Sequence, residues 1–267
     1  MNKTQLLPDR PGIPPMAKLP DPETVDPGEL LRAYESGEID LICVLGPTAS
    51  GKTRYAVELA RALGKAEILS ADSRQVYTGM DIGTGKDLGE YGDVPYHLID
   101  IVPAGMKFNI YQYQSAFADA WADVRRRGAV PILCGGSGLY IESATRAYKF
   151  EKDNGVPVSR LPQSVYYIGT LVSREERVAR IDRRLEERLQ EGLVEEIRGL
   201  LESGIPADDL IYYGLEYKFV TQYVLGQLSY EDMVVALGNA IHQFAKRQMT
   251  WFRGMERDGV RIHWVRP

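Results

Sequence analysis

A glycine-rich segment with the sequence GPTASGKT, residues 46–53, carries the clearest chemical signal in this 267-residue chain. It fits the pattern G-x-x-x-x-G-K-[ST], in which backbone N–H groups surround phosphate oxygens while the lysine adds a positive charge. The hydroxyl of Thr53 is suited to Mg²⁺ or to a phosphate oxygen. An apolar run precedes the segment and a helical pattern follows it, so a helix N-terminus points at the same place. We expect a diphosphate or triphosphate here, rather than an empty glycine-rich turn.

Asp72 is the carboxylate with the most informative position. It ends an apolar run, residues 66–71, and begins the polar sequence DSRQVY, which is poor material for a further strand. A carboxylate across a cleft from a phosphate loop can bind Mg²⁺ or take a proton from a nucleophile. The structural alternative is a turn or helix-capping aspartate. Ser73, Arg74 and Gln75 supply donors and acceptors suited to the edge of a heterocycle or to a phosphate.

Two further glycine-rich segments lie later in the chain. Residues 83–86, GTGK, form a second Gly/Lys cluster, for which a surface turn is at least as good an interpretation. Residues 135–140, GGSGLY, follow a buried-looking strand, so that backbone N–H groups and Ser137 can meet an anion. The alternative for this segment is a tight strand-to-helix turn.

Basic residues cluster on two helical segments of the last third of the chain. Arg180, Arg183, Arg184 and Arg188 populate one helix, and a solvated face is the usual meaning of such a run. They bind a diphosphate only if one face looks into the cleft, where arginine acts as a bidentate clamp. Near the C-terminus, the basic residues Lys246, Arg247 and Arg253 accompany Trp251 and suit either a nucleic-acid backbone or a solvated helix end.

The pattern of the remaining chain predicts how these segments come together. Apolar strand-like runs at residues 39–45, 66–71, 96–101, 129–134 and 165–171 alternate with helical patterns at 54–63 and 109–127. This alternation predicts an α/β fold with a P-loop NTPase-like parallel sheet and helices on both faces. Ligands of such sheets lie outside the carboxyl ends of the strands, where all four polar segments fall.

We divide the chain into three parts. Residues 1–38 form a Pro-rich leader with a short helix near its end, and residues 39–172 form the α/β core. Residues 173–267 form a helical part packed on the core, with helices beginning near Ser173 and Ser229 and a terminal edge strand at 259–265.

Composition excludes several classes of protein. The net charge of −5 argues against a broadly basic nucleic-acid binder and leaves room for a local basic surface. Cys43 and Cys134 lie in buried-looking runs, as expected of small core residues in a reducing cytosol. No apolar run approaches a membrane span, the N-terminus lacks the apolar region of a signal peptide, and no histidine has a zinc-ligand neighbour. We expect a cytoplasmic monomer without a membrane partner.

Taken together, these segments resemble the tRNA dimethylallyltransferase (isopentenyltransferase) family. The matching sequences are GPTASGKT at 46–53, DSRQVY at 72–77, GTGK at 83–86, HLID at 97–100, GGSGLY at 135–140 and AKRQMTWFR at 245–253. The resemblance implies transfer of a dimethylallyl group from dimethylallyl diphosphate to N6 of an adenine beside the tRNA anticodon, with Mg²⁺.

The resemblance also implies roles for particular residues. Asp72 is the general base, Lys52 and Thr53 stabilise the departing diphosphate, and Thr53 contacts the metal. The diphosphate site comprises Gly46, Pro47, Thr48, Ala49, Ser50, Gly51, Lys52, Thr53, Ser137 and an arginine supplied by Arg180 or Arg184. The adenine and tRNA site comprises Asp72, Ser73, Arg74, Gln75, Lys246, Arg247 and Arg253.

Two departures from the family pattern leave the acceptor open. The family inserts a helical domain between GG-x-GLY and the next strand, whereas only residues 141–164 intervene here. Residues 214–218, GLEYK, are only similar to the usual G-Y-K-E region. Adenylate-type relatives, which prenylate free AMP, ADP or ATP, can lack the inserted domain as well. An ATP-using P-loop kinase or NTPase would also contain a phosphate loop of this kind, and so would a non-catalytic paralogue.

Overall fold

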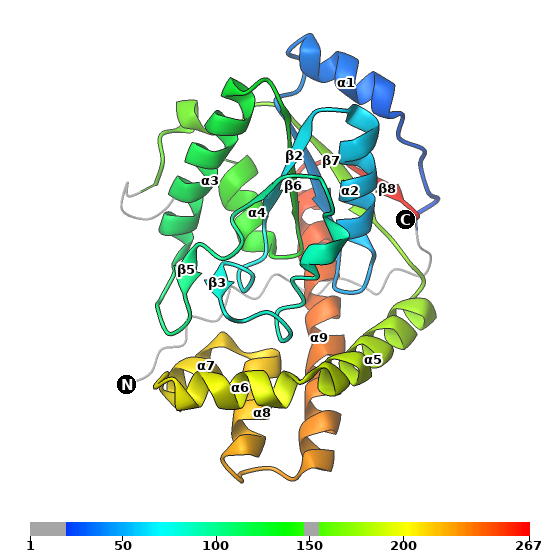
Figure 1. Ribbon diagram of the computed structural model, residues 1–267. Helices are drawn as coiled ribbons and strands as arrows, with labels where there is room; N and C mark the ends of the chain where they lie inside the picture. Colours follow the sequence, from blue (N-terminus) through cyan, green and yellow to red (C-terminus); the bar gives the residue numbers. More distant parts are fainter. Residues whose placement is uncertain (1–19, 147–154) are drawn as a thin grey trace.

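The computed structural model describes residues 20–146 and 155–267, and its centre is a sheet of parallel strands (Figure 1). The strand order is β4-β2-β6-β1-β7-β8, and every neighbouring pair is parallel. The strands are β1 (Leu41–Leu45), β2 (Ala66–Ser70), β4 (Tyr96–His97), β6 (Val130–Gly135), β7 (Val165–Thr170) and β8 (Ile262–Val265). The predicted fold class and the terminal edge strand are confirmed.

Helices cover both faces of this sheet, as predicted. Alternate residues of β1 belong to two separate apolar cores, with Leu41 and Cys43 on one side and Ile42 and Val44 on the other. One core is closed by α1 (Pro27–Glu35) and α2 (Lys52–Leu63), and the other mainly by α3 (Ile110–Arg126), α4 (Gly138–Thr145) and α9 (Tyr230–Arg257). Such burial on both faces explains why the strands read as continuous apolar runs.

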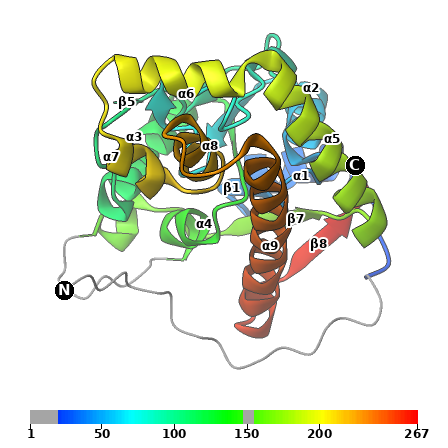
Figure 2. The same ribbon diagram turned by 90° about the horizontal axis from the view of Figure 1, so that it is seen from below.

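The chain after β7 is helical until β8. It forms α5 (Arg174–Glu191), α6 (Leu193–Glu202), α7 (Ala207–Tyr213), α8 (Leu215–Val224) and then α9, which returns to the core. Figure 1 shows α5 to α8 beneath the sheet, and Figure 2 shows α9 between α4 and α5. Ser173 caps α5 by accepting a hydrogen bond from the backbone of Glu176. Within the described residues, no helix is both long and apolar enough to cross a membrane.

Two predictions about strands were wrong. The strand expected at 96–101 ends at His97, because Leu98 and Asp100 adopt positive φ angles of 66° and 56° and turn the chain. The DSRQVY segment, expected not to form a strand, ends in β3 (Tyr77–Thr78), which pairs with β5 (Val102–Pro103) as a small second parallel sheet. Half of the expected leader, residues 1–19, and part of the shortened middle segment, residues 147–154, lie outside the described residues.

Candidate functional site

A cavity of about 100 Å³ lies at the carboxyl ends of the central strands. It collects residues from the phosphate loop, from the turn after β2, from the GTGK segment and from α5. Its lining is Thr48, Ala49, Gly51, Lys52, Thr53, Arg54, Asp72, Gln75, Thr84, Gly85, Asp87, Glu90, Tyr91, Cys134, Gly135, Arg184 and Arg188. The segments that were predicted to share one cleft therefore line the same cavity.

Close packing against β7 explains the first glycine of the phosphate loop. A Cβ atom on Gly46 would lie 2.3 Å from Oγ1 of Thr170 and 2.5 Å from Oγ of Ser50. These two hydroxyl oxygens are themselves 2.6 Å apart and buried. At the other end of the loop, Gly51 has a φ of 82°, which favours glycine. The loop is therefore held in one conformation before any ligand binds.

Lys52 begins α2 directly after the loop and lines the cavity. Desolvation in the cavity lowers the pKa of Lys52, and the negative charge of Asp72 partly offsets this effect. An ammonium group removed from water interacts more strongly with a phosphate than an exposed one does. The lysine and the aspartate of the two predicted motifs thus face the same small space.

Gln248 of α9 joins the phosphate loop to the GGSG segment. Its Oε1 accepts a hydrogen bond from the backbone of Thr48 at 2.8 Å, and its Nε2 donates to the carbonyl of Gly136 at 2.9 Å. Only 7% of this side chain is exposed. The sequence analysis missed this residue, although it falls at helical spacing with the buried Ile241, Ala245 and Phe252. A polar residue on the apolar stripe of a helix is the signal that identifies it.

The turn after β2 fixes one side of the Asp72 carboxylate. Oδ1 accepts a hydrogen bond from the backbone of Arg74 at 3.0 Å, and the backbone N–H of Asp72 donates to Ser70 Oγ at 3.3 Å. The described residues supply no hydrogen-bond donor to Oδ2. One oxygen therefore orients the group while the other is available for a proton or a ligand.

Ser73 and Ser137 contact each other beside this turn. The Ser137 hydroxyl accepts a hydrogen bond from the backbone of Ser73 at 3.1 Å and lies 3.3 Å from its Oγ. Ser137 is the residue before α4 and does not belong to the cavity lining. In this structure its hydroxyl supports the Asp72 turn.

Arg74 and Gln75 lie in different surroundings. The Arg74 guanidinium donates to the carbonyl of Tyr213 at 3.1 Å and stands 5.2 Å from the ring centre of Phe244, so it points into the C-terminal helices. Gln75 lines the cavity, donating to the carbonyl of Gly85 at 3.2 Å and accepting from Ser70 Oγ at 3.1 Å. Gln75 thereby links the Asp72 turn to the GTGK segment.

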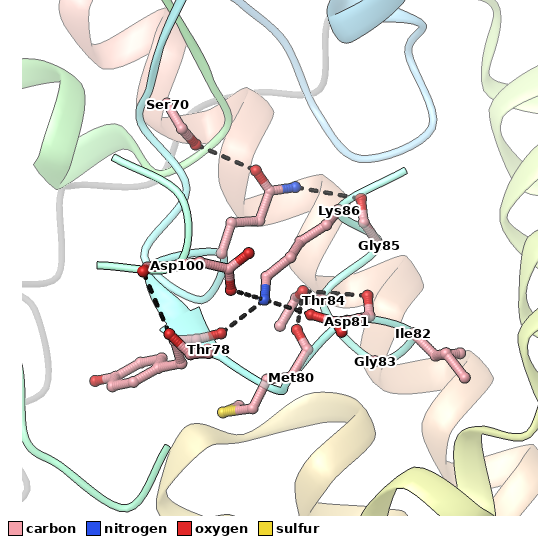
Figure 3. Close-up of polar contacts among 12 residues, drawn as sticks. Ser70, Thr78, Met80, Asp81, Ile82, Gly83, Thr84, Gly85, Lys86 and Asp100 are labelled. Atoms are coloured by element: carbon pink, nitrogen blue, oxygen red, sulfur yellow. Dashed lines mark hydrogen bonds and ion pairs between the residues drawn. The ribbon is translucent and has the colours of Figure 1, made fainter. Parts of the chain in front are cut away.

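The GTGK segment is built around a buried lysine (Figure 3). The Lys86 side chain is 1% exposed, and its ammonium donates to the carbonyl of Tyr77 at 2.7 Å. It also pairs with the carboxylates of Asp81 at 2.6 Å and Asp100 at 2.5 Å. Lys86 therefore holds this segment together, while its neighbours Thr84 and Gly85 reach the cavity.

We expect replacing Lys86 with methionine to lower stability by about 2 to 3 kcal/mol, because two carboxylates and a carbonyl lose their shared donor. For a chain of this size that loss corresponds to a melting temperature lower by about 4 to 10 °C, measurable by calorimetry. Lys107→Met, at an exposed position, is the matched control. Equal melting temperatures for the two variants would contradict a structural role for Lys86.

The arginines of α5 differ in their positions. Arg184 lines the cavity and pairs with Asp87 at 2.5 Å; burial lowers its pKa, and the positive charge of Arg188 lowers it further. Arg180 pairs with Glu176 at 2.5 Å and borders a wider groove of about 710 Å³ beside the cavity. Of the two residues that the sequence offered for the diphosphate, Arg184 is the one at the cavity itself.

The basic residues of α9 differ in their exposure. Lys246 and Arg247 are exposed, whereas Arg253 is half-buried and the described residues supply no hydrogen-bond acceptor to its Nε. Burial lowers the pKa of Arg177 on α5, and the nearby charges of Arg174 and Arg253 lower it further. Positive charge from α5 and α9 thus gathers on one surface of a chain whose net charge is negative.

Hard-cation ligands at the site are few. Thr53 lines the cavity with its hydroxyl, and residues 20–146 and 155–267 hold no cluster of three or more carboxylate, histidine or cysteine side chains suited to a metal ion. Mg²⁺ keeps several waters and commonly binds through substrate phosphates and one or two protein oxygens. The oxygen donors that line the cavity fit a Mg²⁺ ion that keeps most of its waters.

Comparison with known families places this site in context. The family model described as IPP transferase matches residues 75–163 and 149–255, and the model described as isopentenyl transferase matches residues 39–91. The two IPP transferase matches overlap at 149–163, within the segment where the sequence analysis finds the inserted domain shortened.

Individual relatives are also transferases of this kind. The chain is 47% identical to tRNA dimethylallyltransferase 1 of Porphyromonas gingivalis, over 84% of this chain and 93% of that protein. It is 45% identical to tRNA dimethylallyltransferase 2 of Bacteroides fragilis strain ATCC 25285, over 85% of this chain and 93% of that protein. The crystal structure of tRNA delta(2)-isopentenylpyrophosphate transferase from Staphylococcus epidermidis has a TM-score of 0.73 and 31% identity, covering 85% and 92% of the two chains.

The alignment with the Porphyromonas protein also contains positions that this chain lacks. It runs over 282 residues, but 84% of the 267-residue chain is about 224 residues, so about 58 positions in total have no counterpart here.

Proposed function

Because the chain belongs to the IPP transferase family, we propose that it transfers a dimethylallyl group from dimethylallyl diphosphate to N6 of an adenine in tRNA, at the adenosine next to the anticodon. The observation that carries this proposal is the single cavity in which Lys52, Thr53 and Arg184 face Asp72. Cationic and hydroxyl groups suit the leaving diphosphate, and a carboxylate suits the acceptor amine.

On the donor side, the bond between the allylic carbon and the diphosphate oxygen breaks, and negative charge develops on the diphosphate. Several groups are preorganised to stabilise that charge: the Lys52 ammonium, the Arg184 guanidinium and the backbone N–H groups of Ala49, Gly51, Lys52 and Thr53. The N–H of Thr48 is taken by Gln248, and that of Ser50 by the carbonyl of Pro47. Thr53 would hold a Mg²⁺ ion bound with the diphosphate, and that ion would supply further neutralisation of the developing charge. We assign Gly46, Pro47, Thr48, Ala49, Ser50 and Gly51 to the same site.

On the acceptor side, the adenine N6 amine forms the new bond to the allylic carbon and must lose a proton. We assign that proton to Oδ2 of Asp72, since Oδ1 is engaged by the backbone of Arg74. Ser73 and Gln75 flank Asp72 and are proposed to contact the base. Arg74 joins them only if its side chain leaves Tyr213 when the acceptor binds.

For the tRNA backbone we propose the part of α9 that carries the exposed Lys246 and Arg247 and the half-buried Arg253. Because each phosphate contact releases counterions, tRNA affinity should fall steeply with salt. We expect Lys246→Gln/Arg247→Gln to weaken tRNA binding and to reduce the slope of log Kd against log salt by about 2. Arg32→Gln, on α1, is the control. A slope unchanged in the double variant would remove this part of α9 from the tRNA site.

A free adenine nucleotide is the second candidate acceptor. The observation that favours it is the shortened segment at 141–164, together with the 58 unmatched positions of the relative, since less protein is available to hold an anticodon arm. An ATP-using kinase or NTPase would need the same loop, and it would use Asp72 to hold Mg²⁺ or to activate its nucleophile rather than to accept a proton from an adenine amine.

One experiment separates these functions. The chain is incubated with labelled dimethylallyl diphosphate and Mg²⁺, with either bulk tRNA or AMP as the acceptor. We expect label in tRNA. Label only in AMP would move the activity to free nucleotides, and label in neither acceptor, combined with release of phosphate from ATP, would favour an NTPase.

A further inference from the structure

A second arginine stands beside Arg184 at the donor cavity. Arg188 lies one turn further along α5, lines the same cavity and has a side chain only 15% exposed. Both guanidinium groups pack against Gly85 of the GTGK segment: a Cβ atom there would lie 1.8 Å from Nη2 of Arg188 and 3.1 Å from Nη2 of Arg184. The absence of a side chain at Gly85 leaves the space in which these two arginines reach the cavity.

The two arginines are held in different ways. Arg184 pairs with Asp87, whose side chain is 46% exposed. Arg188 donates from Nη1 to Oε1 of Glu216 at 3.1 Å, and the Glu216 side chain is only 6% exposed. A buried, charge-assisted hydrogen bond fixes the direction of a guanidinium better than an exposed ion pair does. Arg188 is therefore the more rigidly placed of the two.

Glu216 lies between two positive charges. Its Oε2 is buried, is 3.7 Å from Nη1 of Arg74 and forms no hydrogen bond within the described residues. This carboxylate therefore neutralises at most one of the two guanidinium groups. A guanidinium carries five N–H donors, and the described contacts of Arg188 occupy one of them. The remaining donors and the uncompensated charge suit a phosphate oxygen pair.

We propose that Arg188 is a second diphosphate-binding residue and that Glu216 is its positioning residue. The inference rests on the proposed function only in taking a diphosphate as the ligand of this cavity. Arg188 and Arg184 lie one helical turn apart on α5, and both bind the diphosphate. Lys52 and the loop N–H groups bind it from the phosphate loop. Glu216, on α8, fixes the direction of the Arg188 guanidinium through its hydrogen bond to Nη1.

The first test measures binding of inorganic pyrophosphate with Mg²⁺ to the full chain by titration calorimetry, without any prenyl acceptor. We expect Arg188→Met to raise Kd at least tenfold, the loss typical of a charged hydrogen-bonded contact. Arg198→Met, an exposed arginine on α6, removes the same charge away from the cavity and should change Kd less than twofold. Equal Kd values for Arg188→Met and the parent chain would overturn the proposal.

The second test asks whether Glu216 acts through Arg188. We expect Glu216→Ala to weaken pyrophosphate binding about three- to tenfold in the parent chain but less than twofold in the Arg188→Met background. Glu216→Gln, which keeps an acceptor oxygen, should restore most of the affinity. The same loss in both backgrounds would show a general structural effect and overturn the positioning role. A parent chain that binds no pyrophosphate would instead contradict the proposed donor site.

Discussion

Replacing Asp72 with asparagine should lower turnover by about 10²- to 10⁴-fold while leaving the donor site intact. Asparagine keeps an oxygen that can accept the hydrogen bond from the backbone of Arg74, so the turn should survive. It cannot take the proton that N6 must lose, and the range given is that of a lost general base. Single-turnover transfer of labelled dimethylallyl groups to tRNA measures the chemical step directly.

Two further measurements make the Asp72 prediction specific. Pyrophosphate affinity of Asp72→Asn should stay within about threefold of the parent value, because the residue acts on the acceptor. Asp93→Asn removes a carboxylate from an exposed ion pair with Arg61 and should leave turnover unchanged. Turnover of Asp72→Asn within about fivefold of the parent would exclude Asp72 as the base.

Replacing Lys52 with methionine should lower kcat by about 10²- to 10³-fold, the cost of removing one preorganised group from a developing anion. Its ammonium is desolvated in the cavity, so water cannot substitute for it. Pyrophosphate binding should weaken as well, because the product carries the charge that the transition state develops. Pyrophosphate affinity should therefore fall in Lys52→Met but stay close to the parent value in Asp72→Asn.

Lys65→Met provides the matched control for Lys52. Lys65 follows the other end of α2, is exposed and donates to the carbonyl of Arg127, far from the phosphate loop. Its loss should leave kcat within twofold of the parent. Lys52→Met that transfers dimethylallyl groups at the parent rate would show that the loop binds its ligand without stabilising the leaving diphosphate.

Local sequence was sufficient for the parts of the site that follow strands. The apolar runs and the glycine-rich segments are signals within about ten residues, and the rule that parallel strands present ligands at their carboxyl ends brings Lys52, Asp72 and Gly135 together. The resemblance to the tRNA dimethylallyltransferase family indicated the reaction, transfer of a dimethylallyl group.

Side-chain contacts between distant segments could not be predicted in this way. Nothing near Gln248 indicates that it bonds Thr48 and Gly136, and nothing near Glu216 indicates that it holds Arg188. The lysine of GTGK was noticed as part of a motif, but its burial between Asp81 and Asp100 depends on how the loop folds back. The prediction of a strand at residues 96–101 was wrong for a related reason. The positive φ of Leu98 ends the strand early, and a leucine in the sequence does not indicate a positive φ.

The hydrogen bond between Thr48 and Gln248 joins residues 200 positions apart. A ribosome adding roughly 5 to 20 residues per second reaches Gln248 some ten to forty seconds after Thr48. During that interval the phosphate loop of the nascent chain lacks its hydrogen bond to Gln248. The edge strand β8 has not yet been synthesised either. The donor site is therefore complete only after the last helix has been synthesised. Incomplete chains that end before Gln248 lack the hydrogen bonds that hold the phosphate loop against the GGSG segment.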